Sequence, residues 1–215
     1  MKQLFSGVFD VKGNVATINA VPGFRVYGEK LVNMDGAQYR MWDPFRSKLC
    51  AAINNKLKNF PFNKKTNVLY LGSSSGTTAS HIADITRGNI YCVEFSKRMM
   101  REFMIVCEKR RNMIPVLADA RHPGEFFNLV DEVDVIYQDV AQPDQAGILI
   151  ANAKVFKPKY AMLSIKARSI NAVKTPKQIF REEIDKLKEK FEILEKIDLK
   201  PYQEDHVLVN LRYRG

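Results

Sequence analysis

Charged side chains recur at the ends of apolar runs in the middle of this 215-residue chain. Glu94, Asp119 and Asp139 each follow such a run, and Lys166 interrupts another. A charge that ends a buried strand is costly unless it is paired. Ligands of open α/β sheets bind at the carboxyl ends of the strands, so these residues are candidates for a ligand site. Asp139 and Lys166, of opposite sign, fit either joint catalytic work or a structural ion pair.

A glycine- and serine-rich loop, Gly72-Ser-Ser-Ser-Gly76, separates one apolar run from a helical pattern. Gly72 and Gly76 permit backbone conformations that other residues avoid, and the helix N-terminus offers unpaired N–H groups to polar ligand atoms. Glu94 follows Gly76 by 18 residues, close to the spacing of about 20 at which an acid binds ribose hydroxyls. The combination predicts a nucleotide-like cofactor.

The spacing of the glycines in this loop also helps to discriminate between classes of cofactor. NAD and S-adenosylmethionine both carry an adenosine ribose, so the acid alone does not distinguish them. However, the loop lacks the close glycine pair of a dinucleotide fingerprint, and no lysine follows Gly76 as in a Walker loop. Asp119 could accept a hydrogen bond from an adenine amino group, with the small Ala120 leaving room for the ring. The alternative for Asp119 is a helix cap before Pro123.

Beyond residue 66 the sequence alternates between strand and helix patterns, which predicts a doubly wound, mostly parallel α/β sheet of Rossmann-like type. Strands are expected near residues 68–71, 90–94, 113–118, 133–138 and 160–166, and helices near 77–86, 96–111 and 142–153. A capping box at Thr175–Gln178 starts a last helix. Two final runs, 191–198 and 206–213, have no helix between them and should form an antiparallel hairpin, giving seven strands in all.

The first 43 residues have a different character. Their runs of apolar and β-branched residues indicate a small antiparallel β domain, residues 1–43, ahead of a main domain, residues 44–215. The runs cover residues 4–11, 15–19, 25–27 and 38–42. Asp43 and Pro44 are an N-cap and first-turn pair, which predicts a helix through about Leu57.

Composition bounds the possible functions. The net charge is +10, of which residues 1–66 carry +7 (11 basic, 4 acidic) and residues 67–215 carry +3 (23 basic, 20 acidic). This excess suggests a polyanionic partner, most simply nucleic acid, although a solvated basic surface is the alternative. Cys50, Cys92 and Cys107 occur singly, so we expect core thiols and no metal. No apolar stretch approaches the roughly 18 residues of a membrane span and no signal-peptide pattern is seen, so we expect a cytoplasmic protein.

Five segments, in order, closely resemble the fibrillarin family in its compact archaeal form, without the arginine- and glycine-rich tail of the eukaryotic form. They are Tyr39-Arg-Met-Trp-Asp-Pro-Phe-Arg-Ser-Lys-Leu49, Leu69-Tyr-Leu-Gly-Ser-Ser-Ser-Gly-Thr-Thr78, Val93-Glu-Phe-Ser96, Leu117-Ala-Asp-Ala-Arg-His-Pro123 and Gln138-Asp-Val-Ala-Gln-Pro143. The resemblance runs essentially from end to end. Asp43 stands where the family often has asparagine, and Ser73-Ser74 where alanines are common.

The resemblance implies an S-adenosylmethionine-dependent methyltransferase acting on ribose 2′-hydroxyls of rRNA and tRNA. It further implies a box C/D guide RNA and its target RNA as partners, with a Nop-domain scaffold and a kink-turn-binding ribosomal-type protein. The implied catalytic set is Lys48, Asp139, Lys166 and His206. The implied cofactor-binding residues are Gly72, Gly76, Thr77, Thr78, Glu94, Phe95, Asp119, Ala120, Asp139, Val140, Ala141 and Gln142.

The chemistry of methyl transfer suggests a role for each member of that catalytic set. The hydroxyl must lie in line with the donor and lose its proton as the bond forms. We expect Lys166 to accept the proton or position the hydroxyl and Asp139 to orient it, with Lys48 and His206 supporting charge and substrate phosphate. Two other classes stay open: a methyltransferase for small molecules or proteins on the same fold, and a non-catalytic RNA-binding scaffold.

Overall fold

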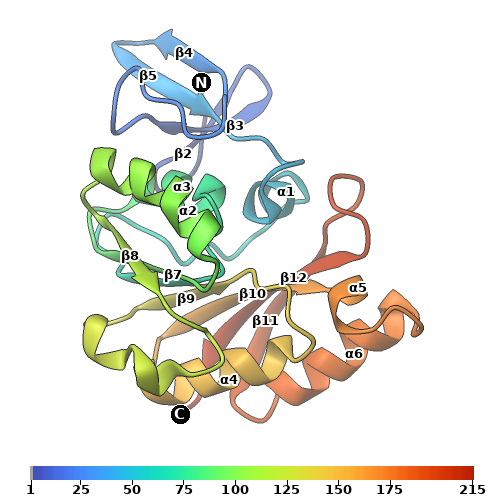
Figure 1. Cartoon of the computed structure of the whole chain (residues 1–215). Helices are drawn as coiled ribbons and strands as arrows, with labels where there is room; N and C mark the ends of the chain where they lie inside the picture. The colour runs from blue at the N-terminus through green and yellow to red at the C-terminus, as the bar shows by residue number, and fades with distance from the viewer. Residues whose placement is uncertain (1) are drawn as a thin grey trace.

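The computed structural model describes residues 2–215, which form two β-sheets with helices packed around the larger one (Figure 1). The smaller sheet has five strands and uses only residues before 42, and the larger has seven strands and begins at Val68. Within the described residues, no helix is long and apolar enough to cross a membrane.

The smaller sheet is antiparallel, with strand order β1-β2-β3-β5-β4. Its strands are β1 (Lys2–Phe5), β2 (Val8–Val11), β3 (Asn14–Ile18), β4 (Leu31–Met34) and β5 (Ala37–Met41). The antiparallel sheet predicted for this region is confirmed. The strand expected at 25–27 is wrong, because the Glu29 carboxylate accepts hydrogen bonds from the backbone N–H groups of Val26 and Tyr27 and leaves a loop there.

The larger sheet confirms the predicted architecture, including the antiparallel C-terminal hairpin. Its strand order is β11-β12-β10-β9-β6-β7-β8, with β6, β7, β8, β9 and β10 parallel. These strands are β6 (Val68–Leu71), β7 (Ile90–Glu94), β8 (Met113–Leu117), β9 (Val135–Gln138), β10 (Tyr160–Lys166), β11 (Phe191–Asp198) and β12 (His206–Tyr213). From β6 the chain adds β7 and β8 on one side, and it then crosses to the other side of β6 to add β9 and β10. The strand order therefore reverses between β6 and β9, which is the usual position of a ligand crevice.

Six α-helices accompany these strands in the described chain. They are α1 (Lys48–Asn54), α2 (Thr77–Ile85), α3 (Lys97–Lys109), α4 (Gln145–Phe156), α5 (Ala167–Ile170) and α6 (Pro176–Leu187). The predicted capping box of α6 is present, with Thr175 and Gln178 satisfying each other's backbone N–H groups. The one-turn helix α5 carries no periodic signal and was not expected.

Alternation along the strands divides the core between the two faces of the larger sheet. In β6, Val68 and Tyr70 face α1, α2 and α3, whereas Leu69 and Leu71 face α4 and α6. This period of two with apolar residues on both faces is what a buried parallel strand requires. The first core also contains Val8 from the small sheet, so the two sheets share packed residues. The division into domains at residue 43 stays a prediction.

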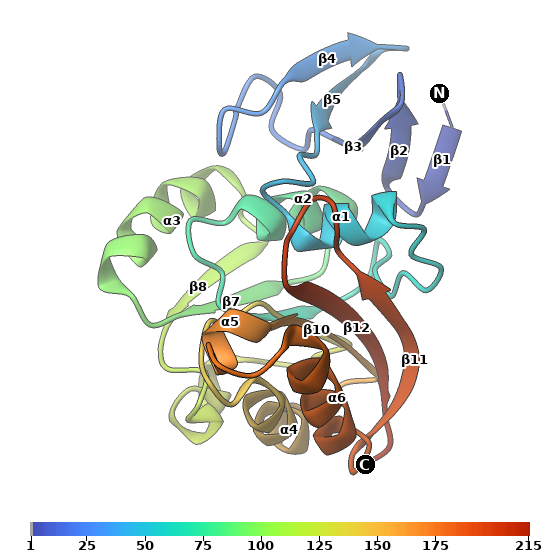
Figure 2. The same cartoon turned by 90° about the vertical axis from the view of Figure 1, so that its right-hand side faces the viewer.

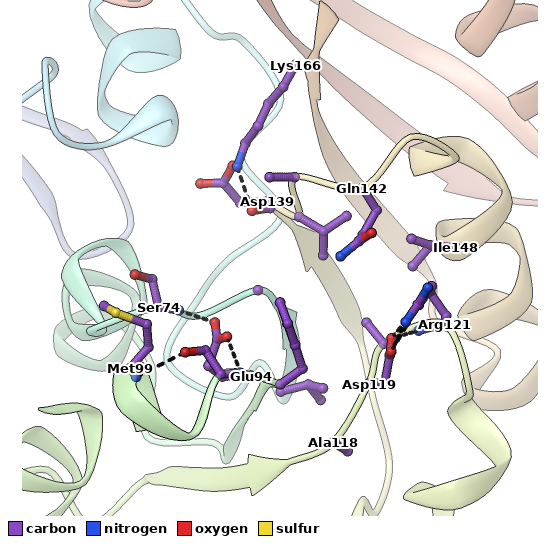
Figure 3. A pocket seen from close by; sticks show the side chains of 17 residues that line it. Ser74, Glu94, Met99, Ala118, Asp119, Arg121, Asp139, Gln142, Ile148 and Lys166 are labelled. Carbon is purple, nitrogen blue, oxygen red and sulfur yellow. Dashed lines mark hydrogen bonds and ion pairs between the residues drawn. The ribbon is translucent and has the colours of Figure 1, made fainter. Parts of the chain in front are cut away.

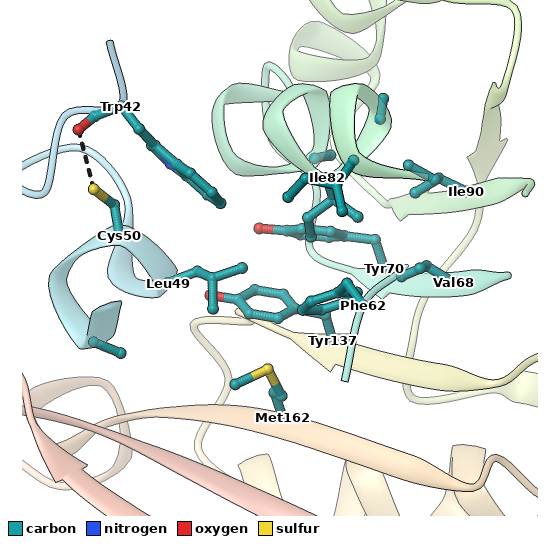
Figure 4. Packing of buried hydrophobic residues seen from close by; sticks show 14 of the residues in the cluster. Trp42, Leu49, Cys50, Phe62, Val68, Tyr70, Ile82, Ile90, Tyr137 and Met162 are labelled. Carbon is teal, nitrogen blue, oxygen red and sulfur yellow. Dashed lines mark hydrogen bonds between the residues drawn. The ribbon is translucent and has the colours of Figure 1, made fainter. Parts of the chain in front are cut away.

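Helix α1 begins later than its sequence suggested. The predicted N-cap, Asp43, instead closes a turn by accepting the N–H of Phe45, and Ser47 caps the helix. Ser47 is favoured because its hydroxyl also bonds the Thr78 hydroxyl at 2.9 Å, a contact that only the folded chain provides. Leu49, on the inner face of α1, lies beside Tyr137 of β9 (Figure 4).

The loop between β11 and β12 packs against α1 and the turn that precedes it (Figure 2). The Gln203 side-chain amide donates to the Phe45 carbonyl at 2.6 Å, and the Asn55 amide donates to the carbonyls of Asp198 and Lys200, each at 2.7 Å. The start of α1 and the start of β12 are therefore held together, although they lie about 160 residues apart in sequence.

A buried ion network fastens the small sheet to α2. Arg40 of β5 lies 2.6 Å from Glu29 and 2.7 Å from Asp84, and the Arg110 guanidinium also contacts Asp84. Beside it, burial lowers the pKa of His81 well below its ordinary value. The neutral ring shares hydrogen bonds with Thr17 and Tyr27 and stacks on Trp42 with ring centroids 4.5 Å apart.

A substitution that removes one charge from this network should strongly lower the stability of the fold. Asp84→Asn removes the carboxylate between two buried guanidinium groups, so we expect the free energy of unfolding to fall by about 3–5 kcal/mol. Denaturant unfolding monitored by circular dichroism measures it. Asp185→Asn, on the exposed surface of α6, removes a charge from an exposed ion pair with Lys188 and should change little. Equal stability of both variants would contradict a coupling role for the network.

Candidate active site

A cavity of about 360 Å³ opens at the carboxyl edge of the larger sheet, where β6, β7, β8 and β9 end (Figure 3). Its volume is within the range of small-molecule sites. Residues from loops after four parallel strands line it, together with Lys166 of β10. The lining consists of Gly72, Ser74, Val93, Glu94, Phe95, Ser96, Met99, Ala118, Asp119, Ala120, Arg121, Asp139, Val140, Ala141, Gln142, Ile148 and Lys166.

Glu94 is the best-supported ribose ligand of this cavity. Its residue is 7 % exposed, and its two oxygens accept the backbone N–H groups of Ser74 at 2.9 Å and Ser96 at 2.8 Å. A carboxylate has about four acceptor positions, so these two bonds fix its orientation and leave capacity for two hydroxyl donors. The vicinal hydroxyls of a ribose are such donors.

Asp119 lies at the far end of the same cavity and is held by Arg121. The guanidinium donates from two nitrogens at 2.9 Å and 2.6 Å to one carboxylate oxygen, and these bonds hold the pKa of Asp119 below its ordinary value. The helix-cap alternative is wrong, since Asp119 accepts the N–H of Arg121 within a turn and the next 3₁₀ turn begins at Pro123 after His122. An ionised Asp119 still has acceptor positions for an amino group.

Asp139 is the meeting point of two lysines. Lys48 Nζ lies 3.2 Å from Oδ2 and Lys166 Nζ lies 2.9 Å from Oδ1, while Lys166 also donates to the Asp139 carbonyl at 2.9 Å. All three side chains are 14–17 % exposed. The predicted pairing of Lys166 with Asp139 is confirmed, and the cluster carries one positive charge in excess at the mouth of the cavity.

The backbone beside Asp139 depends on a glycine. Gly72 follows β6 with φ at +82°, and a Cβ there would lie 2.9 Å from the Asp139 carbonyl oxygen. Strands β6 and β9 are paired up to Leu71 and Gln138, and the Asp139 N–H donates to the Leu71 carbonyl. A side chain at position 72 would therefore push away the carbonyl that receives Lys166.

His206 joins this group from β12. In the antiparallel β10–β12 ladder it is the direct partner of Lys166, so the two side chains start from adjacent backbone positions. Its Nδ1 contacts the Glu204 carbonyl, and a carbonyl can only accept, so Nδ1 carries the proton. Burial, together with the positive charges of Lys48 and Lys166, lowers the pKa of His206 below its ordinary value of 6.5. The ring is neutral at pH 7 and Nε2 has a free lone pair.

The structure brings together most of the residues expected from the sequence. Ten of them line the cavity: Gly72, Glu94, Phe95, Asp119, Ala120, Asp139, Val140, Ala141, Gln142 and Lys166. Gly76, Thr77 and Thr78 do not line it. Gly76 caps α2 with φ at +91°, and Thr78 bonds Ser47 at the start of α1. Their role in cofactor binding stays a prediction, and Thr78 has a structural task in addition.

Several lining residues were not expected from the sequence: Ser74, Val93, Ser96, Met99, Ala118, Arg121 and Ile148. Arg121 lies within Leu117–Pro123, one of the segments that resemble the fibrillarin family. Its positive charge two residues after Asp119 could have indicated that it belongs to the site. Met99 and Ile148 belong to helices α3 and α4 and look like ordinary core residues in the sequence. Among residues 2–215, no cluster of His, Cys, Asp or Glu is arranged to hold a metal ion.

The three thiols behave as expected. Cys50 and Cys92 are buried, Cys107 is partly buried, and all are free. Burial raises the pKa of each, to about 12 for Cys107. Cys50 donates from Sγ to the Trp42 carbonyl at 3.0 Å and so helps to hold α1 to the end of β5.

Known proteins resemble this chain along essentially its whole length. The fibrillarin family model matches residues 1–215. A relative from Methanopyrus kandleri, described as a fibrillarin-like rRNA/tRNA 2′-O-methyltransferase, is 51% identical over 98% of this chain and 95% of its own length.

Two solved structures add to the comparison. Aeropyrum pernix fibrillarin, crystallised with natively bound S-adenosyl-L-methionine, superposes with a TM-score of 0.85 at 44% identity, covering 92% of this chain and 88% of that one. A fibrillarin solved in complex with Nop5p superposes with a TM-score of 0.92 at 36% identity, covering 99% of this chain and 100% of that one. The chain belongs to the fibrillarin family.

Proposed function

We propose that this chain is an S-adenosylmethionine-dependent RNA ribose 2′-O-methyltransferase and the catalytic subunit of a box C/D guide ribonucleoprotein. The observation that carries the proposal is the carboxylate of Asp139 between the ammonium groups of Lys48 and Lys166 at the mouth of the cavity. His206 stands beside them as the cross-strand partner of Lys166. The relatives described above support the reaction class.

The cavity fits S-adenosylmethionine in its donor and acceptor groups. Glu94 would bind the ribose hydroxyls, and Asp119 would accept from the adenine amino group between the small Ala118 and Ala120. The three carboxylates that line the cavity, Glu94, Asp119 and Asp139, suit a ligand with a positive sulfonium and ammonium. When bound, the cofactor supplies an electrophilic methyl group.

The lysine–aspartate cluster would align the ribose hydroxyl. Lys166 and Lys48 hold Asp139 from two sides, so a hydroxyl placed against this cluster meets both ammonium donors and a carboxylate acceptor in a fixed geometry. Alignment of two reactants contributes several kcal/mol to a transfer reaction. We therefore assign Lys166 to positioning the hydroxyl, Asp139 to orienting Lys48 and Lys166, and Lys48 to supporting the negative charge that develops on oxygen.

The proton of the hydroxyl has an acceptor within the same group. His206 is neutral and carries its proton on Nδ1, which leaves the Nε2 lone pair. Lys166, by contrast, lies against both the carboxylate and the carbonyl of Asp139. Its ammonium N–H groups therefore already point at acceptor oxygens. We assign proton acceptance to His206 in preference to Lys166.

The partners follow from the same reaction. The likeness to a fibrillarin solved with Nop5p supports a Nop-domain scaffold. We further propose a kink-turn-binding ribosomal-type protein, the guide RNA, and rRNA and tRNA targets chosen by base pairing with that guide. Because ribosome and tRNA maturation would provide the substrates, we place the enzyme in the cytoplasm.

Two rival functions make different predictions. A methyltransferase for small molecules or proteins would not need the charge of +7 in residues 1–66, and a non-catalytic scaffold would not need to hold two lysines on one partly buried carboxylate. Incorporation of labelled methyl into guide-matched RNA, with and without the partner proteins, distinguishes all three. Transfer to a protein or small molecule but not to ribose would favour the first rival, and cofactor binding without transfer would favour the second.

Glu94→Ala should weaken S-adenosylmethionine binding by about 1–3 kcal/mol, because a buried hydrogen bond to ribose is lost. Calorimetry measures the affinity. Glu102→Ala, on the exposed face of α3, is the matched control and should bind as the parent does. Unchanged affinity in Glu94→Ala would remove Glu94 from the ribose role, and a preference for NAD would overturn the cofactor.

Lys166→Ala and Asp139→Ala should each reduce single-turnover methyl transfer in the assembled complex by about 100-fold or more, the scale expected for lost alignment or proton transfer. Lys166→Ala should keep its affinity for the cofactor, whereas Asp139→Ala should lose some, because it removes one of the three carboxylates in the cavity lining that suit a cationic ligand. A folded, cofactor-bound Lys166→Ala that methylates at the parent rate would make the ion pair purely structural.

The lowered pKa of His206 sets the expected pH dependence. Above that pKa, which lies below 6.5, the ring is neutral and can accept a proton. As the pH falls through the pKa of His206, the ring becomes charged and methyl transfer should slow. His206→Gln should be slow at all pH values and should lack this acidic limb. Single-turnover rates from pH 5 to 8, with folding checked at each pH, test it. An identical acidic limb in parent and variant would exclude His206 as the acceptor.

A further inference from the structure

A second cavity, of about 480 Å³, is lined by His206 and by none of the residues to which cofactor binding is assigned above. It is formed by the end of β11, the start of β12, Arg168 of α5 and the first turns of α6. His206 lines this cavity, whereas its cross-strand partner Lys166 lines the first one. The two cavities therefore meet at the Lys166–His206 pair, where we place the reacting hydroxyl.

The second cavity is basic. Its lining contains four cations, Arg168, Lys177, Lys196 and Lys200, and two acids, Asp198 and Asp205. Arg168 is paired with Asp205 at 2.9 Å, and Lys200 with the neighbouring Glu204 at 3.2 Å. Lys177 and Lys196 form no ion pair with any residue of the described chain, 2–215.

Lys196 is exposed and lies against an aromatic ring of α6. Its Nζ lies 5.7 Å from the centroid of the Phe180 ring, a cation–π contact that holds the ammonium over α6 without neutralising it. Lys177 is exposed at the start of the same helix. The N-terminus of α6 is already satisfied by the Thr175 cap, so the side chains, and not the helix end, give this cavity its charge.

We propose that this cavity binds a backbone phosphate of the substrate RNA strand, next to the nucleotide being methylated, through Lys177 and Lys196. The inference rests on the proposed function. In RNA the carbon that bears the 2′-hydroxyl adjoins the carbon that bears the 3′-phosphate, so a hydroxyl at Lys166 and His206 brings its own phosphate alongside. Two cations that form no ion pair within residues 2–215, in a cavity lined by four basic side chains and two acids, are complementary to that phosphate.

The proposed subsite would set register and not sequence. Phosphate contacts position a nucleic acid without reading its bases, and the target is read by the guide in the proposed function. Two cations beside His206 would fix which ribose along a guide-paired strand reaches the cluster of Lys48, Asp139 and Lys166.

The test compares two double variants in the assembled, guide-loaded complex. Lys177→Gln with Lys196→Gln removes the proposed contacts. Lys64→Gln with Lys65→Gln removes the same charge from exposed lysines just before β6, at the opposite, amino-terminal edge of the sheet. Single-turnover methylation is measured against substrate RNA concentration and salt. Cofactor affinity and folding are measured in parallel.

Counterion release gives the expected size of the effect. Each neutralised phosphate contributes about 0.7 to the salt slope on a single strand and about 0.9 on a B-form duplex, or about five- to eight-fold in affinity near 0.1 M salt. Lys177 and Lys196 share one phosphate in this proposal, so loss of both lysines should raise the half-saturating RNA concentration by about five- to eight-fold at that salt and lower the slope by about 0.7–0.9. The maximal rate and cofactor affinity should stay at parent values. Lys177→Arg with Lys196→Arg should keep parent affinity, because it keeps the charges.

Three results would overturn the inference. They are equal half-saturation in the two Gln variants, a lowered maximal rate with unchanged half-saturation, or a defect in loading the guide RNA instead of the substrate. Failure of the parent complex to methylate any ribose would overturn the proposed function itself. A parent that is active, together with a Lys177/Lys196 variant that matches its control, would reject only the subsite.

Discussion

The carboxylate of Asp139 is the point at which side chains from a helix and from a strand of the larger sheet converge. It joins Lys48, the first residue of α1, to Lys166, the last residue of β10, at distances of 3.2 and 2.9 Å. A lysine in the first turn of a helix is unfavourable, because the N-terminal end of the helix dipole is positive, and α1 has no acid in that turn. Asp139 offsets both this cost and the repulsion between the two ammonium groups.

The rest of the N-terminal region keeps α1 where Asp139 requires it. Ser47 is bonded to Thr78 of α2, Cys50 is bonded to the Trp42 carbonyl, and Gln203 reaches the turn before α1 from the hairpin loop. The Arg40–Asp84 ion pair connects the small sheet to α2 behind these contacts. Lys48 is therefore positioned from three directions, as a preorganised site requires, since a shift of about 1 Å costs roughly 100-fold in rate.

Sequence reasoning was most successful where local pattern and final structure agree. The apolar runs of β6 to β10, the capping box at Thr175 and the C-terminal hairpin depend on local signals, and the structure confirms them. Because ligand sites of such sheets lie at strand ends, Glu94 and Asp139 could be proposed from position alone. The errors lie where a tertiary partner decides the local structure. Ser47 replaces Asp43 as the cap because of Thr78, and Glu29 occupies backbone N–H groups in the loop taken for a strand.

Lys48 and His206 could be placed in the site only through the family resemblance, for a related reason. One enters from a helix outside the sheet and the other from an antiparallel strand, so neither follows a parallel strand whose end marks the crevice. The two cavities that meet at Lys166 and His206 differ in the charge of their lining residues. The acids Glu94 and Asp119 lie in the first cavity, and the unpaired lysines of α6 and β11 lie in the second. A cationic methyl donor and an anionic RNA strand are thus each favoured on one side of the Lys166–His206 pair and disfavoured on the other. Because the two reactants have opposite charge, the same separation that selects each of them also fixes the direction from which each approaches the hydroxyl oxygen.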